Sequence, residues 1–112
     1  MNKNWKILND TLQLEQIQKE SNHKKQVLFK HSTSCGISLY AYEKLETNWN
    51  FSVDEFDFYY LDLLQFRAIS NTVASKWKVN HQSPQIIVID KEMVTYTCSH
   101  HKISAEDLRK NI

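Results

Sequence analysis

The chain has 112 residues, of which 41% are hydrophobic and 12% are aromatic. This length suits a single domain spanning residues 1–112, and the apolar fraction is too high for a disordered chain. The formal net charge is +1, and lysines and arginines are scattered along the chain. These features exclude a strongly basic nucleic-acid-binding protein and a protein held on a membrane surface by a basic patch.

The chain shows no sequence signal for membrane insertion or export. No apolar stretch approaches the roughly 20 residues that a transmembrane helix needs. Residues 1–10 are polar and lack the apolar core of a signal peptide. We therefore expect a cytoplasmic protein in which the two cysteines, Cys35 and Cys98, are free thiols. Because there is no C-x-x-C pair, we expect no metal site of the zinc type.

The first predicted element is a helix. Asp10 or Thr11 can cap its amino terminus, and the helix is expected to end near Ser21. Leu14 and Ile17 lie on one face, which is the face expected to be buried.

A buried strand and a second helix follow a polar loop. Residues 27–29 form a continuous apolar run, which is typical of a strand buried on both faces. Hydroxyl-bearing residues that favour helix starts come next, and we expect a helix from about Ser34 to Asn48. Apolar residues recur along it at helical spacing: Ile37, Tyr40 or Ala41, and Leu45.

The second half of the chain adds three strands and two helices. Strands are expected over 57–63, 85–89 and 93–98, and helices over 66–78 and from about 103 onward. Simple alternation places Val94, Tyr96 and Cys98 on one face of the last strand. Ser104 and Asp107 resemble a capping box at the start of the last helix.

The expected order of elements is αβαβαββα. The first two strands, joined through a helix, form a right-handed βαβ unit, and the last two form an antiparallel hairpin. The sequence therefore predicts an α/β fold with a central mixed four-stranded sheet and helices on both faces.

Cys35 has the sequence context of a reactive thiol. It lies where a buried strand leads into a helix, and the unpaired N–H groups of a helix start stabilise a thiolate relative to a thiol. Gly36 would let a bulky disulfide approach, and the hydroxyl of Ser38 could donate a hydrogen bond to the Cys35 thiolate. The plainer interpretation of Cys35 is a small hydrophobic residue packed in the core.

Pro84 is the single proline of the chain, and it stands between Ser83 and the third predicted strand. Only about 5% of X–Pro bonds are cis, so the residue alone favours a trans proline at the start of a strand.

Two stretches of the chain resemble the bacillithiol-linked monothiol bacilliredoxins, a family with a thioredoxin-like fold. The stretches are VLFKHSTSCGIS at 27–38 and HQSPQII at 81–87. Ser99 and His100, followed by Ile103, resemble the closing segment of that family. The similarity runs over nearly the whole chain.

The resemblance implies a thiol–disulfide oxidoreductase that removes bacillithiol from S-bacillithiolated client proteins. Cys35 would attack the mixed disulfide, release the reduced client and carry bacillithiol, and another bacillithiol would restore the thiol. Bacillithiol would thus be a co-substrate, and no tightly bound cofactor is expected. Because Cys35-x-x-Ser38 lacks a second thiol, a general dithiol reductase is disfavoured.

The resemblance also implies the outline of a substrate-binding site. Pro84 would be cis and would lie beside Cys35, and the Ser83 backbone would be free to pair with an extended substrate. The residues expected to bind substrate are Thr33, Ser34, Gly36, Ser38, Ser83 and Pro84.

Several further residues have two interpretations each. His31 ends the first buried strand, where it could help to ionise Cys35 or simply bond the backbone, and His81 has the same ambiguity.

In the expected sheet order Cys98 lies about 9–10 Å from the strand of Cys35, whereas a disulfide needs Cα atoms within about 7 Å. An unpaired edge-strand thiol is therefore favoured for Cys98. Lys24, Lys25 and Lys30 could meet the carboxylates of bacillithiol, but solvated surface lysines are the default interpretation.

Two other functions are left open by the sequence. One is a non-catalytic thioredoxin-like module that binds a partner peptide near Pro84. The other is a thiol-dependent reductase of a small oxyanion, which is weaker because no arginine accompanies Cys35.

Overall fold

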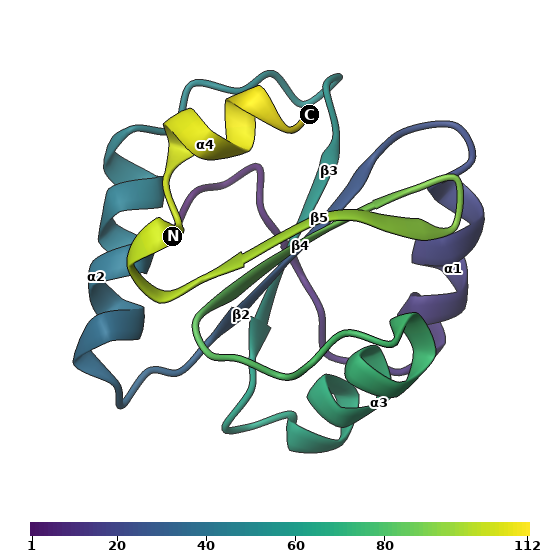
Figure 1. Ribbon diagram of the computed structural model, residues 1–112, viewed down its shortest axis with the longest axis horizontal. Coiled ribbons are helices and arrows are strands. Elements are labelled where there is room, and N and C mark those ends of the chain that lie inside the picture. The colour runs from purple at the N-terminus through teal and green to yellow at the C-terminus, as the bar shows by residue number, and fades with distance from the viewer.

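A computed structural model describes all residues, 1–112, and shows one five-stranded sheet with helices on both faces (Figure 1). The strands lie in the order β1-β3-β2-β4-β5. No helix is both long and apolar enough to span a lipid bilayer. The elements are β1 (Lys6–Ile7), α1 (Leu12–Glu20), β2 (Gln26–His31), α2 (Gly36–Thr47), β3 (Asp57–Asp62), α3 (Arg67–Trp77), β4 (Gln85–Asp90), β5 (Met93–Ser99), the 3₁₀ helix η1 (His100–Lys102) and α4 (Ala105–Lys110).

The strand connections follow the predicted plan. Strands β2 and β3 are parallel and joined through α2, while β4 pairs antiparallel with β2 and forms a hairpin with β5. The prediction of four strands omits β1, a two-residue edge strand that pairs parallel with β3. Both of its residues are exposed, so it carries no alternation of apolar and polar residues that the sequence could reveal.

The two faces of the sheet are packed differently. One face, here named the aromatic layer, packs under α2 and α4. The other, the aliphatic layer, packs under α1 and α3. Figure 1 shows these two pairs of helices on opposite sides of the strands. The aromatic layer is built around Trp5, Phe29, Phe51, Phe56 and Phe58, and the aliphatic layer around Leu8, Leu14, Ile17, Leu28, Leu61, Ile87 and Ile89.

The buried face of α2 matches the predicted one at Ala41 and Leu45 but differs from it in the first turn. Ser38, Ala41 and Leu45 are buried, whereas Ile37 and Tyr40 are 43% and 55% exposed. The prediction followed apolar residue type and so missed that a serine occupies the first buried position. As a result, the first turn of α2 presents a polar side chain to the end of β2 and an apolar one to solvent.

Strand β5 breaks the predicted alternation. A bulge lies opposite Val88 and Ile89, because Val88 pairs with Tyr96 while Ile89 pairs with Val94. Val94 therefore packs against the aliphatic layer, whereas Tyr96 and Cys98 pack against the aromatic layer. The prediction that all three share one face is wrong, because a bulge inserts a residue and shifts the period of two.

Local signals at the helix starts are largely confirmed. Ser104 caps α4 by accepting a hydrogen bond of 3.0 Å from the Asp107 N–H. At α1 the Asp10 carboxylate, rather than the Thr11 hydroxyl, accepts the Leu12 N–H at 2.9 Å. These bonds satisfy amide groups that the helix itself leaves unpaired.

Candidate functional site

Cys35 is the N-cap residue of α2. Its backbone is extended, with φ −111° and ψ 124°, and its carbonyl accepts the Leu39 N–H at 2.9 Å. The Cys35 N–H donates to the Ser32 carbonyl at 3.3 Å, which closes the turn between β2 and α2. The side chain is partly exposed and belongs to no disulfide. A partly exposed thiol therefore lies at the start of a helix, as the sequence predicts, but its sulfur accepts no hydrogen bond from the unpaired amide groups there.

The residues next to Cys35 leave the thiol accessible. Thr33, Ser34 and Gly36 are exposed. A Cβ built on Gly36 would meet no atom within 4 Å, so the space above this position is open. The expected room for a bulky disulfide is therefore present, although it does not depend on glycine at this position.

Ser38 is fully buried and has partners other than Cys35. Its hydroxyl oxygen lies 2.7 Å from His31 Nδ1 and accepts the Ser32 N–H at 2.9 Å. The expected hydrogen bond from Ser38 to the Cys35 thiol does not form, because the end of β2 engages this hydroxyl. Ser38 therefore ties the turn that carries Cys35 to the strand before it.

His31 acts on the same turn from inside the aromatic layer. Its side chain is 2% exposed, and its ring lies 5.1 Å from that of Tyr42 and 5.5 Å from that of Tyr60, centroid to centroid. Burial lowers the pKa of His31, while the Asp62 carboxylate and the hydrogen bond with Ser38 oppose that shift. The prediction of a role beside Cys35 holds only indirectly, because the hydrogen-bond partner of His31 is Ser38.

Ser83 and Pro84 lie at the same edge of the sheet as the end of β2. The last paired residues of β2 and β4 are Lys30 and Gln85, so the segment before Gln85 continues alongside His31. The Ser83–Pro84 peptide bond is cis, as the family resemblance implies, so the trans bond expected from the proline alone is wrong. The Ser83 backbone makes no backbone hydrogen bond, whereas the Pro84 carbonyl accepts one of 3.1 Å from His100. A free backbone donor and acceptor are therefore present at this edge.

Cys98 has a different environment. It lies in β5 opposite Ile86 and packs against the aromatic layer. Burial raises the pKa of the Cys98 thiol, and the Asp107 carboxylate adds to this, while a hydrogen bond with Tyr96 opposes it. The thiol is free, and its environment favours the unreactive protonated form at neutral pH.

Lys30 is not the surface residue that the sequence predicts. Its side chain is 0% exposed, and its Nζ atom lies 3.1 Å from His81 Nδ1 and 3.2 Å from the Ser70 carbonyl. Lys30 therefore cannot meet a bound thiol at the surface, and His81 is bonded to Lys30 rather than to Cys35. The missed signal is the position of Lys30 within a strand that is buried on both faces, directly after the apolar run 27–29.

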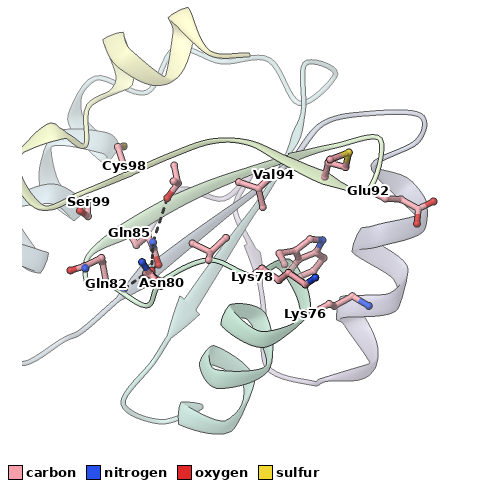
Figure 2. A pocket seen from close by; sticks show the side chains of 13 residues that line it. Lys76, Lys78, Asn80, Gln82, Gln85, Glu92, Val94, Cys98 and Ser99 are labelled. Carbon is pink, nitrogen blue, oxygen red and sulfur yellow. Dashed lines mark hydrogen bonds between the residues drawn. The ribbon is translucent and has the colours of Figure 1, made fainter.

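The largest hollow of the surface lies apart from Cys35. It is a groove of about 780 Å³ between β5 and the segment that follows α3. Figure 2 shows Ser99 and Gln82 at one end of this groove and Lys76 and Glu92 at the other. Cys35 does not line this groove and lies instead at the edge where β2 ends and β4 begins.

Comparison with known proteins places this geometry in a family. Residues 6–108 match the family model described as monothiol bacilliredoxin BrxC. A solved structure of a candidate oxidoreductase with a thioredoxin fold is 29% identical, with a TM-score of 0.81, over 96% of this chain and 93% of that one.

Two thioredoxin structures show the same fold at lower identity. The thioredoxin of Fasciola hepatica is 20% identical, with a TM-score of 0.68, over 94% of this chain and 93% of that one. The thioredoxin of Malassezia sympodialis is 15% identical, with a TM-score of 0.71, over 95% of this chain and 85% of that one. The fold is therefore thioredoxin-like, and the chain belongs to the monothiol bacilliredoxin family of thiol–disulfide oxidoreductases, which remove bacillithiol from proteins.

Proposed function

We propose that Cys35 is the nucleophile that takes bacillithiol from client proteins and that a second bacillithiol resolves the adduct. One observation carries this proposal. Cys35 is a partly exposed thiol at a helix start, and it shares its edge of the sheet with the unpaired backbone of Ser83. An extended client chain that pairs with Ser83 would bring its modified cysteine to Cys35.

The reaction consists of two thiol–disulfide exchanges. The Cys35 thiolate attacks the bacillithiol sulfur of the client mixed disulfide, and a bond forms between Cys35 Sγ and that sulfur. The client sulfur leaves as a thiolate and takes a proton from water. The thiolate of a second bacillithiol then attacks the bacillithiol sulfur bound to Cys35. Bacillithiol disulfide forms, and Cys35 returns as a thiolate.

Cys98 takes no part in this cycle. Its thiol packs against the aromatic layer and has a raised pKa, both of which disfavour attack on the Cys35 adduct. Cys98 in β5 pairs with Ile86 in β4, which in turn pairs with Phe29 inside β2. Cys35, by contrast, lies beyond the end of β2. The adduct is therefore resolved by bacillithiol rather than by an intramolecular disulfide.

The surface beside Cys35 suits a polypeptide substrate. Ile37, the second residue of α2, is 43% exposed, and Leu64, in the turn after β3, is 44% exposed. Strand β3 is parallel to β2, and Asp62 pairs with His31, so Leu64 follows at the same edge. In the proposal these two side chains add apolar contacts with the client protein. In this proposal Thr33, Ser34, Gly36, Ser83 and Pro84 form the surrounding site.

Intact-mass analysis tests the proposal. A bacillithiolated client is mixed with the wild type, Cys35→Ser and Cys98→Ser. We expect one bacillithiol on the wild type and on Cys98→Ser, and none on Cys35→Ser. Release of the client with an oxidised protein that lacks the adduct, dependent on both cysteines, would make Cys98 the resolving thiol. No transfer to the wild type would contradict the proposal and favour a non-catalytic binding module.

A further inference from the structure

Lys30 is buried without a carboxylate partner. Its side chain is 0% exposed, and none of the ion pairs of the protein includes it. Its two hydrogen-bond partners, the Ser70 carbonyl and the His81 ring, are neutral acceptors. Burying an ammonium group in this way costs stability, because neutral acceptors replace only part of its hydration. A role in the fold alone does not account for a charged residue at this position.

The Lys30 ammonium fixes the protonation of His81. An ammonium group has donors only, so His81 Nδ1 must accept and the ring proton must lie on Nε2. Burial lowers the pKa of His81, and the positive charges of Lys30 and Arg67 lower it further. The imidazole is therefore neutral at pH 7. The Ser70 hydroxyl also lies 3.4 Å from His81 Nδ1, but a hydroxyl can donate or accept, so it is the Lys30 ammonium that selects one of the two tautomers.

Gln85 holds the same loop from the neighbouring strand. It is the register partner of Lys30, and it is 2% exposed. Its side-chain amide donates to the Asn80 carbonyl at 3.0 Å and to the Thr97 hydroxyl at 3.4 Å (Figure 2), and its oxygen accepts the Gln82 N–H at 3.3 Å. Two adjacent buried side chains, one from β2 and one from β4, thus hold the loop 80–82. This loop leads directly into Ser83 and Pro84.

We propose that Lys30 is a positioning residue for substrate binding, which acts through His81 to hold the loop 80–82 so that the Ser83 backbone can receive the client chain. This role rests on the proposed function, and it involves no contact between Lys30 and the substrate. Removal of the ammonium leaves His81 Nδ1 with only the Ser70 hydroxyl, which can donate or accept, so both tautomers become possible and the loop is held less firmly. Client binding is therefore weakened, while the rate of thiol–disulfide exchange at Cys35 is little changed.

Steady-state kinetics with a bacillithiolated client test the proposal through Lys30→Met, which keeps an unbranched side chain one atom shorter than that of lysine and lacks the donor. We expect KM to rise about tenfold, the factor associated with one hydrogen bond to a charged group, while kcat changes little. The midpoint of urea unfolding should stay the same or rise. The matched control is Lys24→Met, which removes a lysine bound to Asp57 at the opposite end of β2 and should leave KM unchanged.

A double-mutant cycle and a spectroscopic readout separate positioning from a purely structural role. If Lys30 acts through His81, Lys30→Met should add little to the KM of His81→Ala. Nitrogen-15 NMR should show the Nε2–H tautomer of His81 in the wild type and a mixture of tautomers in Lys30→Met. Lys30→Leu, which also lacks a donor, serves in the same measurements if the Met variant does not fold.

Two results would overturn the inference: an unchanged KM, or a joint loss of kcat and stability with no change in the His81 tautomer. The NMR measurement does not require the protein to take bacillithiol from a client. A wild type that fails to take bacillithiol but shows the Lys30-dependent tautomer would therefore overturn the proposed function alone.

Discussion

Lys30 and His31 are neighbours in β2, yet their side chains enter opposite layers of the protein and support opposite sides of one site. His31 enters the aromatic layer and bonds Ser38 at 2.7 Å, which holds the turn of Cys35. Lys30 enters the aliphatic layer and bonds His81 at 3.1 Å, which holds the loop before Pro84. The first pair forms the nucleophile wall of the site, and the second forms the substrate wall.

The two walls differ in the charge that they bury. On the nucleophile wall a neutral imidazole meets a hydroxyl, and aromatic rings pack around them. On the substrate wall an ammonium group is buried with neutral partners only. A satisfied neutral hydrogen bond stabilises a core, whereas a buried unpaired charge destabilises it. We therefore expect mutations of the nucleophile wall to lower stability, and mutations of the substrate wall to impair client binding without that loss.

The largest stability effect is expected for Ser38→Ala. It leaves the Ser32 N–H and His31 Nδ1 without their hydrogen-bond partner in the core. The free energy of unfolding should fall by about 2–4 kcal/mol, measured by urea denaturation. The control is Ser34→Ala, since Ser34 is exposed and makes one long contact of 3.5 Å with Ser32. A loss no larger than that of the control would show that the nucleophile wall does not depend on this hydrogen bond.

A smaller effect is expected from the titration of Lys30. Burial lowers the pKa of Lys30 from 10.5 to about 8. Between these values the unfolded chain keeps a proton that the folded protein has lost, so stability rises with pH; below about pH 8 both states are protonated and the contribution is constant. Relative to Lys30→Met, the wild type should gain about 1–3 kcal/mol between pH 8 and 10.5. A difference that does not change over this range would place the lysine in a water-like environment.

The smallest effect is expected at a hydrogen bond outside both walls. The Ser104 hydroxyl caps α4 by accepting the Asp107 N–H. Ser104→Ala should lower the free energy of unfolding by about 1 kcal/mol and leave the transfer of bacillithiol unchanged. If bacillithiol transfer falls together with stability in this variant, activity follows stability in general. The two walls then could not be distinguished by their separate effects on stability and client binding.

The fold was largely predictable because the strong signals are local. Strands β2 and β4 contain continuous apolar runs, and α3 has buried residues at helical spacing. The errors in the predicted strands lie where pairing with other strands, rather than the local sequence, determines the structure. A two-residue edge strand such as β1 leaves no pattern, and the bulge that separates Val94 from Tyr96 and Cys98 depends on pairing with β4.

The site was predictable in part. Cys35 and Pro84 stand out because a thiol at a helix start and a lone proline are rare features of this chain. The partners of Ser38 and Lys30 were not predictable. Those of Ser38 lie at the end of the preceding strand, and those of Lys30 lie in α3 and in the loop after it. Long polar side chains in buried strands find partners through packing, which sequence spacing does not specify.

Alkylation of Cys35 by iodoacetamide tests most directly the claim that the site has two separate walls. In a Cys98→Ser background Cys35 is the single thiol, and iodoacetamide is too small to need the client-binding surface. We predict that Ser38→Ala slows alkylation severalfold, because the turn of Cys35 loses its anchor, while Lys30→Met reacts at the rate of the parent protein. Equal slowing by both substitutions would contradict the account, because it would show that Lys30 acts on the thiol itself rather than on the substrate.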